Sequence, residues 1–179
     1  MPVKEELRPP YTQIRVDEHL VLRQLQPEEA QELFDLTKKN WEYLKPWMPW
    51  LEDNRTVKDS EKFIRSALDK KNQEILYGYG MIYDGRIAGH MSIMHLKDEM
   101  YPEIGYWLDN ELNGRGLTTK AVKRLTDFGL NTLGLKQILI KALPENGASN
   151  RVAEKCGYVL KETKEYPGRG PMNVWVVRG

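Results

Sequence analysis

Hydrophobic and polar positions along the chain follow two periodicities, which together predict a mixture of strands and helices. Apolar residues alternate with polar ones between Ile14 and Leu25, as they do in a strand or hairpin with one buried face. After Pro27 and again after Thr56, apolar residues recur three and four positions apart, which is typical of one face of a helix. Proline suits a first helical turn and threonine suits an N-cap. The two predicted apolar faces are Ala30, Leu33, Phe34 and Thr37 in the first helix and Phe63, Ile64, Ala67 and Leu68 in the second.

The centre of the chain carries a hairpin signal. Asp84-Gly85 stands between two strand-like runs, 74–83 and 86–96, and Asp-Gly favours the tight turns that join antiparallel strands. The segment 40–51 contains two prolines and predicts at most a short helix and a loop.

The last part of the chain predicts one strand–helix–strand unit followed by a hairpin. A strand is expected at 103–108, a helix at about 116–131 and a strand at 137–142, which should form a parallel crossover. A short helix at 149–155 ends before Gly157, which suits a helix C-terminus. Runs 158–164 and 172–177 predict the final hairpin. We therefore predict one α+β domain with a mixed sheet over residues 1–179, in which residues 1–10 form a loose N-terminal arm.

Composition narrows the class of protein. The 179 residues are 40% hydrophobic, enough for a core, and the formal net charge of +1 argues against nucleic-acid binding based on bulk charge. The single cysteine, Cys156, excludes an internal disulfide and fits a reducing, cytoplasmic setting. No apolar run approaches the ~20 residues that span a bilayer, and the N-terminus lacks the apolar region of a signal peptide. We expect no metal, because His19, His90 and His95 show no ligand spacing with acids or cysteine.

Two glycines, Gly114 and Gly116, stand where the strand at 103–108 passes into the next helix. The segment does not match a P-loop, and it lacks the third glycine and the later acid of a dinucleotide fingerprint. An ordinary strand-to-helix turn is one interpretation. The other is an anion site, because a helix N-terminus presents unpaired N–H groups and glycine admits a ligand close to the backbone. Thr118 and Thr119 would add hydroxyl donors, and Arg115 would add charge or simply face solvent.

Several segments in order resemble the GCN5-related N-acetyltransferases, the GNAT superfamily, and within it the bacterial group that acetylates the N-termini of ribosomal proteins. The matching segments are Glu103-Ile104-Gly105-Tyr106-Trp107 with Gly114-Arg115-Gly116 and Thr119, Leu44 to Leu51, Arg86 to Ile93, and Asn146 to Tyr158. Two positions depart from the pattern: Glu111 stands where the family's turn begins with Gln or Arg, and Tyr158 replaces Phe.

The resemblance implies a GNAT fold, in which helices flank a mixed central β-sheet whose fourth and fifth strands, here 103–108 and 137–142, splay apart. Acetyl-CoA would enter the gap, its pantetheine arm pairing near Trp107 and Leu108 and its pyrophosphate meeting the N–H groups that follow. The N–H near Trp107 would polarise the thioester carbonyl. The implied cofactor-binding residues are Trp107, Leu108, Asn113, Gly114, Arg115, Gly116, Leu117, Thr118, Thr119, Asn146 and Asn150.

The resemblance also implies catalytic roles. Glu103 would act as the base, and the pKa of an α-amine, near ~8, makes a modest base sufficient; the alternative is a surface glutamate at a turn. Ser149 would protonate the departing CoA thiolate, although it also stands where a helix N-cap belongs. Asn146 would orient the cofactor or a water, or else it is a turn residue. Asn150 would contact the pantetheine amides.

Aromatic residues and one histidine are candidates for the acceptor site. Trp47 and Trp50 would wall this site together with Trp41, and His95 would line it. The alternatives are core packing for the tryptophans and an ordinary strand position for the histidine. Cys156 fits a buried structural residue better than a nucleophile.

We therefore predict an acetyl-CoA-dependent N-acetyltransferase that acts by direct attack in a ternary complex. The favoured acceptor is a protein N-terminus such as that of a ribosomal protein, with a homodimer possible and no nucleic-acid or membrane partner. Two alternatives stay open: a polyamine or aminoglycoside acetyltransferase, and a non-catalytic acyl-CoA-binding sensor. Thiol release across a panel of amines separates them.

Overall fold

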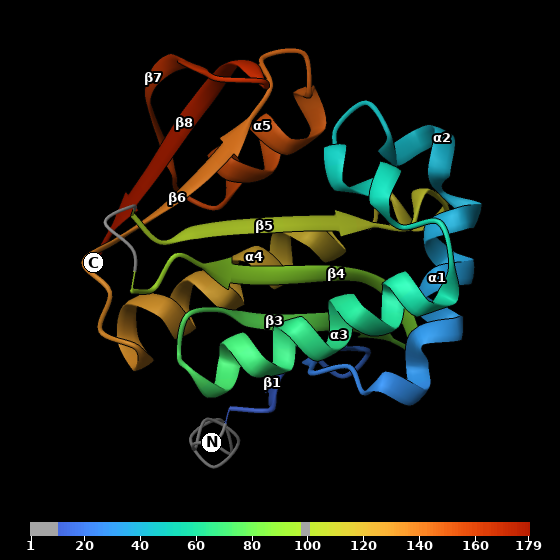
Figure 1. The fold of residues 1–179 in the computed structure, drawn as a ribbon. Coiled ribbons are helices and arrows are strands. Elements are labelled where there is room, and N and C mark those ends of the chain that lie inside the picture. The colour runs from blue at the N-terminus through green and yellow to red at the C-terminus, as the bar shows by residue number, and fades with distance from the viewer. Residues whose placement is uncertain (1–10, 98–100) are drawn as a thin grey trace.

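The computed structural model describes residues 11–97 and 101–179, which form a mixed β-sheet with helices on both faces (Figure 1). The eight strands lie in the order β1-β2-β3-β4-β5-β6-β8-β7. Neighbouring strands are antiparallel except β5 and β6, which are parallel. The predicted α+β fold and the parallel unit are therefore confirmed. The predicted N-terminal arm, residues 1–10, lies outside the described residues.

The elements follow the predicted order with shifted ends. The strands are β1 (Gln13–Arg15), β2 (Leu20–Arg23), β3 (Tyr77–Tyr83), β4 (Arg86–Met94), β5 (Glu103–Leu108), β6 (Gln137–Ala142), β7 (Val159–Tyr166) and β8 (Gly170–Arg178). The helices are α1 (Ala30–Lys39), α2 (Trp41–Leu44), α3 (Val57–Asn72), α4 (Leu117–Asp127) and α5 (Gly147–Lys155). Short 3₁₀ turns are η1 (Pro27–Glu29), η2 (Pro49–Asp53) and η3 (Asn110–Leu112), and a π-helical turn, η4 (Phe128–Thr132), extends α4.

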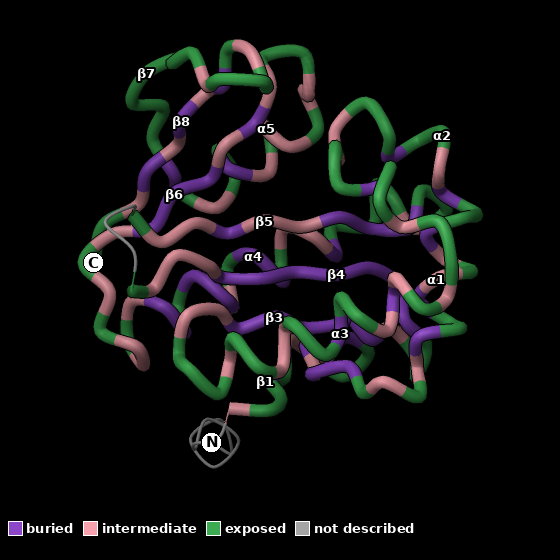
Figure 2. The backbone as a smooth tube through the Cα atoms, viewed as in Figure 1, coloured by how far each residue is buried: buried purple, intermediate pink, exposed green. Residues whose placement is uncertain are grey.

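Two layers of buried side chains hold the helices to the sheet. Helix α4 covers one face, where Leu125 and Phe128 pack against the strands in a cluster without solvent exposure. Helices α1 and α3 cover the opposite face, with Leu33 and Ile64 in a second cluster. Figure 2 shows that β3 and β4, at the centre of the sheet, are buried along most of their length. The central strands, including β4 and β5, are therefore held between helices on both faces of the sheet.

Local signals explain where several elements begin. Asp84 and Gly85 have φ angles of 47° and 81°, as the predicted tight hairpin turn requires. Thr56 caps α3 in a reciprocal capping box with Asp59. Both predictions are confirmed.

Two local predictions were wrong. Helix α5 begins at Gly147, because the Asn146 side chain caps it by accepting from the N–H of Ser149 at 3.1 Å. Ser149 is therefore not the N-cap; Asn and Ser are equally good caps, and the chain uses the earlier one. Phe63 does not lie in the core: it is 42% exposed, while the neighbouring Ile64 is 2% exposed. Phe34 is only partly buried.

The sheet is interrupted between β5 and β6. These strands share one ladder pair, Glu103 with Leu139, and the N–H of Leu139 also donates to the Pro102 carbonyl at 2.8 Å. Beyond this point the two strands diverge (Figure 1). The expected splayed strands are therefore confirmed.

Candidate functional site

A cleft of about 1130 Å³ opens where β5 and β6 separate. Its walls come from both strands, from the first turns of α4 and α5, and from the segment that joins α2 to α3. A cleft of this size exceeds the ~300–1,000 Å³ of ordinary small-molecule sites. It therefore has room for a long ligand together with a second reactant.

One edge of β5 offers unpaired main-chain groups to this cleft. The N–H of Asp109 donates to the Ala88 carbonyl at 2.7 Å, toward β4. Main-chain groups alternate between the two sides of a strand, so those of Tyr106 and Leu108 face the gap. The N–H near Trp107 that was predicted to polarise the thioester carbonyl is therefore expected to be that of Leu108, because the Trp107 N–H faces β4; Trp107 itself lines the cleft. An extended amide chain can add to β5 at this edge.

The start of α4 presents a set of N–H groups to the same cleft. Gly116 is the N-cap in the left-handed conformation, with φ 75°, and Gly114 has φ 78°. Lys120 is the first residue whose N–H reaches the helix, at the Gly116 carbonyl (3.0 Å). The N–H groups of the residues before it have no helical acceptor. The cleft-lining residues here are Leu112, Asn113, Gly114, Gly116, Leu117, Thr118 and Thr119.

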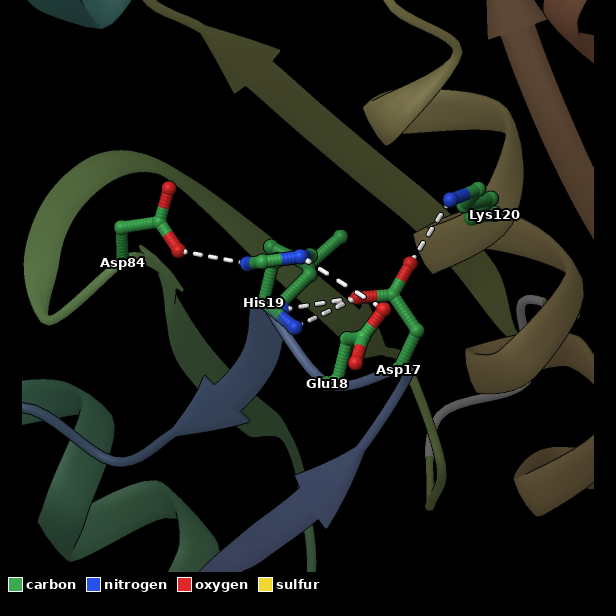
Figure 3. Close-up of polar contacts among 6 residues, drawn as sticks. Asp17, Glu18, His19, Asp84 and Lys120 are labelled. Atoms are coloured by element: carbon green, nitrogen blue, oxygen red, sulfur yellow. Dashed lines mark hydrogen bonds and ion pairs between the residues drawn. The ribbon is translucent and has the colours of Figure 1, made fainter.

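Ion pairs fix this turn to the rest of the fold. Lys39 of α1 pairs with Asp109 at 2.9 Å and with Glu111 at 2.7 Å. Lys120 pairs with Asp17, in the loop between β1 and β2, at 2.7 Å (Figure 3). The hydrogen bond from Lys120 lowers the pKa of Asp17 to about 2, so this contact persists at neutral pH. Arg115 does not line the cleft and is exposed, so the main-chain N–H groups and the hydroxyls of Thr118 and Thr119 remain as the predicted anion contacts.

Ser149 lines the cleft and is hydrogen-bonded to a half-buried tyrosine. Its Oγ lies 2.9 Å from the Tyr106 hydroxyl. Burial raises the pKa of Tyr106 to about 12, so this hydroxyl keeps its proton. Because Asn146 caps α5, the Ser149 hydroxyl is not occupied by capping. The pair can therefore deliver a proton into the cleft.

Glu103 lies at the point where β5 and β6 part. Its Oε2 is 2.8 Å from the Lys141 ammonium, and the two side chains are only 15% and 10% exposed. Lys141 also lies 4.9 Å over the Tyr166 ring. Glu103 and Lys141 both line the cleft, so the predicted base is in reach of a ligand there.

Three predicted site residues do not line the cleft: Arg115, as described above, Asn150 and His95. The Asn150 side chain donates to the Leu143 carbonyl at 2.9 Å and accepts from the Trp175 indole at 2.8 Å. These bonds make it a tie between α5 and β8. His95 follows β4 and does not line the cleft. Trp47 and Trp50 do line it, and Trp41 packs against the core.

Sequence reasoning gave no site role to several residues of the cleft, among them Tyr106, Lys141, Phe63 and His90. Lys141 had a readable signal, because it is the one charged residue in the apolar strand 137–142. Tyr106 lies between Ile104 and Leu108 on one strand face, but the serine it meets is distant in sequence. Burial raises the pKa of Cys156 to about 11, which supports its interpretation as a structural thiol.

Nowhere in the described part of the chain do three His, Cys, Asp or Glu side chains gather as a metal site needs. None of the helices within residues 11–97 and 101–179 combines the length and the apolar character that crossing a bilayer requires.

Known proteins are similar to this chain in sequence and in fold. The family of the acetyltransferase (GNAT) domain matches residues 19–159. The putative ribosomal N-acetyltransferase YdaF of Bacillus subtilis is 30% identical over 160 residues, covering 86% of this chain and 85% of that protein. The ribosomal-protein-serine acetyltransferase of Escherichia coli is 24% identical and covers 83% of each chain.

Two solved structures share the fold. The microcin C7 self-immunity acetyltransferase MccE, in complex with acetyl-CoA and AMP, has a TM-score of 0.87 at 24% identity, covering 97% of this chain and 98% of its own. The ribosomal α-N-protein acetyltransferase RimL, in complex with coenzyme A, has a TM-score of 0.86 at 21% identity, covering 93% and 97%. The splayed strands, the N–H groups at the start of α4 and these matches agree: this chain belongs to the GNAT acetyltransferase family.

Proposed function

We propose that this enzyme transfers the acetyl group of acetyl-CoA to the N-terminal α-amine of a ribosomal protein. The observation that carries the proposal is the continuous path from the free edge of β5 to the N–H groups that begin α4. The names of the relatives in Bacillus subtilis and Escherichia coli support the choice of acceptor.

The residues of the cleft fit acetyl-CoA, whose thioester supplies the activated acetyl group. The pyrophosphate fits the N–H groups that precede Lys120, where the helix dipole favours an anion. From there to its sulfur, the pantetheine arm is about as long as four extended residues, ~14 Å. This length lies within the ~20 Å of the six-residue β5. Its amides therefore pair with Tyr106 and Leu108.

The reaction moves two protons, one away from the amine and one to the departing thiolate, and polar side chains of the cleft can handle both. The attacking amine must be neutral, and an α-amine with a pKa near ~8 is partly neutral at physiological pH. Glu103 takes the proton that the amine loses, through a water, while Lys141 fixes its carboxylate at the mouth of the gap. Ser149 gives a proton to the thiolate and regains one from solvent, while Tyr106, 2.9 Å behind it, keeps its own proton and holds the serine hydroxyl in place by a hydrogen bond.

The test measures thiol release from acetyl-CoA with synthetic peptides that match the N-termini of ribosomal proteins. We expect release with free α-amines, and mass spectrometry should place the acetyl group on the first residue. The control peptides carry a blocked N-terminus and a free lysine. Release with polyamines or aminoglycosides alone would favour the small-molecule alternative. Tight CoA binding without release for any amine would favour the sensor.

A further inference from the structure

An aromatic cluster lines the cleft on the side of α3. The rings of Trp50 and Phe63 are nearly parallel, at 12°, with centroids 6.4 Å apart. Both side chains are more than a third exposed, at 39% and 42%. Below them, Trp107 lies 6.4 Å from Trp50, and His90 lies edge-on to Phe63 at 4.9 Å. Adjacent exposed rings in a cleft mark a surface that a ligand covers.

His90 adds a polar group that the protein itself does not satisfy. It is 8% exposed, lines the cleft and stands directly across the β4–β5 ladder from Trp107. Within the described residues no hydrogen bond to either ring nitrogen is found, and neither nitrogen is among the fully buried unpaired atoms, so the ring keeps a polar edge that solvent or a ligand can reach. A small cavity of about 10 Å³ on its other side is lined mainly by apolar neighbours such as Leu25 and Ile64.

The cleft can supply a partner for this polar edge, since His90 lines it. Burial lowers the pKa of His90 to about 4, so the imidazole is neutral at physiological pH and offers one donor and one acceptor. Water can pair with the imidazole in the free enzyme, and a ligand with a polar edge can take the place of that water.

We propose that Trp50, Phe63 and His90 form a subsite for a planar ring with a hydrogen-bonding edge, carried by the acceptor next to its reactive amine. The ring stacks on the two exposed aromatic side chains, and its polar edge meets the imidazole. This inference rests on the proposed amine acetylation and specifies the kind of acceptor.

The position of the subsite places this ring close to the amine. Trp107 and Glu103 lie on the same face of β5, four residues or ~13 Å apart. Gly105 lies between them and leaves that stretch of the strand without a side chain. One or two extended residues, each spanning ~3.5 Å, together with a ring-bearing side chain bridge this distance. The ring therefore belongs to the first or second residue of a peptide acceptor, or to the base of an amine-bearing nucleoside.

The test compares acetylated product peptides that begin with Ala, Leu, Phe or Tyr, titrated calorimetrically into enzyme saturated with CoA. We expect Phe to bind about fivefold tighter than Leu, because ring stacking adds to burial. Tyr should bind about fivefold tighter than Phe, because its hydroxyl pairs with the imidazole. 5′-Amino-5′-deoxyadenosine forms the second arm and reports whether a nucleobase fills the subsite better than a peptide ring.

Variants separate the two contacts. Phe63→Leu, at an exposed position, should remove most of the preference for Phe over Leu. His90→Leu should remove the preference for Tyr over Phe, and His90→Gln should restore part of it. Tyr101→Leu, at a ring 57% exposed and outside the cleft, is the control and should change neither.

The outcomes distinguish this inference from the proposed function. Equal binding of Leu, Phe, Tyr and the nucleoside, or preferences unchanged in Phe63→Leu, would overturn the ring subsite even if peptides are acetylated. Ring-selective binding without thiol release from any amine would support the subsite and refute the proposed acetyl transfer.

Discussion

Replacing Gly116 by valine tests whether main-chain N–H groups hold the cofactor. Gly116 has φ 75° at the N-cap of α4, and a Cβ built there meets nothing within 4 Å. A β-branched residue in this left-handed region is a rare outlier, and the conformation costs ordinary residues about 1–2 kcal/mol. Because an added Cβ meets no clash, the cost lies in the backbone conformation itself, and the valine variant should relax to negative φ and turn the following N–H groups away.

The expected loss of CoA affinity follows from the contacts removed. A hydrogen bond to a charged group contributes about 1.5–3 kcal/mol, and 1.4 kcal/mol is a factor of ten in Kd. Loss of one such bond to the pyrophosphate therefore weakens CoA binding about 10-fold to 150-fold. Isothermal titration calorimetry measures this change directly.

Gly134 provides a matched control. It also has positive φ, 71°, and open space around a built Cβ, but it does not line the cleft. Gly134→Val should lower the urea midpoint about as much as Gly116→Val and leave the Kd for CoA unchanged. If Gly116→Val binds CoA with the wild-type Kd, or if both variants weaken binding equally, the N–H groups at the start of α4 do not hold the pyrophosphate.

The other predictions concern the proton-transfer residues and the surface cluster in Figure 3. Glu103→Gln should lower kcat about 100-fold, within the usual range for a general base, at unchanged Kd for CoA; wild-type turnover at neutral pH would exclude this residue as the base. Ser149→Ala should lower kcat about 100-fold. Tyr106→Phe should lower it about tenfold, the effect of one lost hydrogen bond. Single-turnover thiol release measures both, and a larger effect of the tyrosine change would mean that Ser149 is not the proton donor to the thiolate. The hydrogen bond with Asp84 raises the pKa of His19 above 6.5, so the pair stabilises the fold below pH 6.5 and loses this contribution as pH rises through the raised pKa. Urea midpoints between pH 5.5 and 8.5 should fall more for the wild type than for Asp84→Asn, and an NMR titration of His19 below 6.5 would contradict this.

Elements with strong local signals could be predicted from the sequence. The Asp84-Gly85 turn and the Thr56 cap depend on a few adjacent residues, and both appear in the structure. The glycines before α4 likewise predict a helix N-terminus whose N–H groups a ligand can approach. Local conformational preference decides these features, so one segment contains the necessary information.

The parts that could not be predicted depend on contacts between distant segments. The amide of Asn150 is taken by Trp175 of β8, which no local pattern indicates. The start of α5 had two suitable caps, Asn146 and Ser149, and propensity cannot choose between them. Phe63 fits the apolar stripe of α3 but turns to the cleft. Tertiary packing decides each of these cases.

Because β5 and β6 share a single ladder pair, the sheet consists of two groups of strands that are only weakly joined. Strands β6, β7 and β8 form one hydrogen-bonded patch, and β1 to β5 form another. Such patches open as separate cooperative units in hydrogen exchange. A ligand whose amides bridge the gap acts as an inserted strand, so slower exchange in β6 upon CoA binding would reveal a sheet that its own substrate completes.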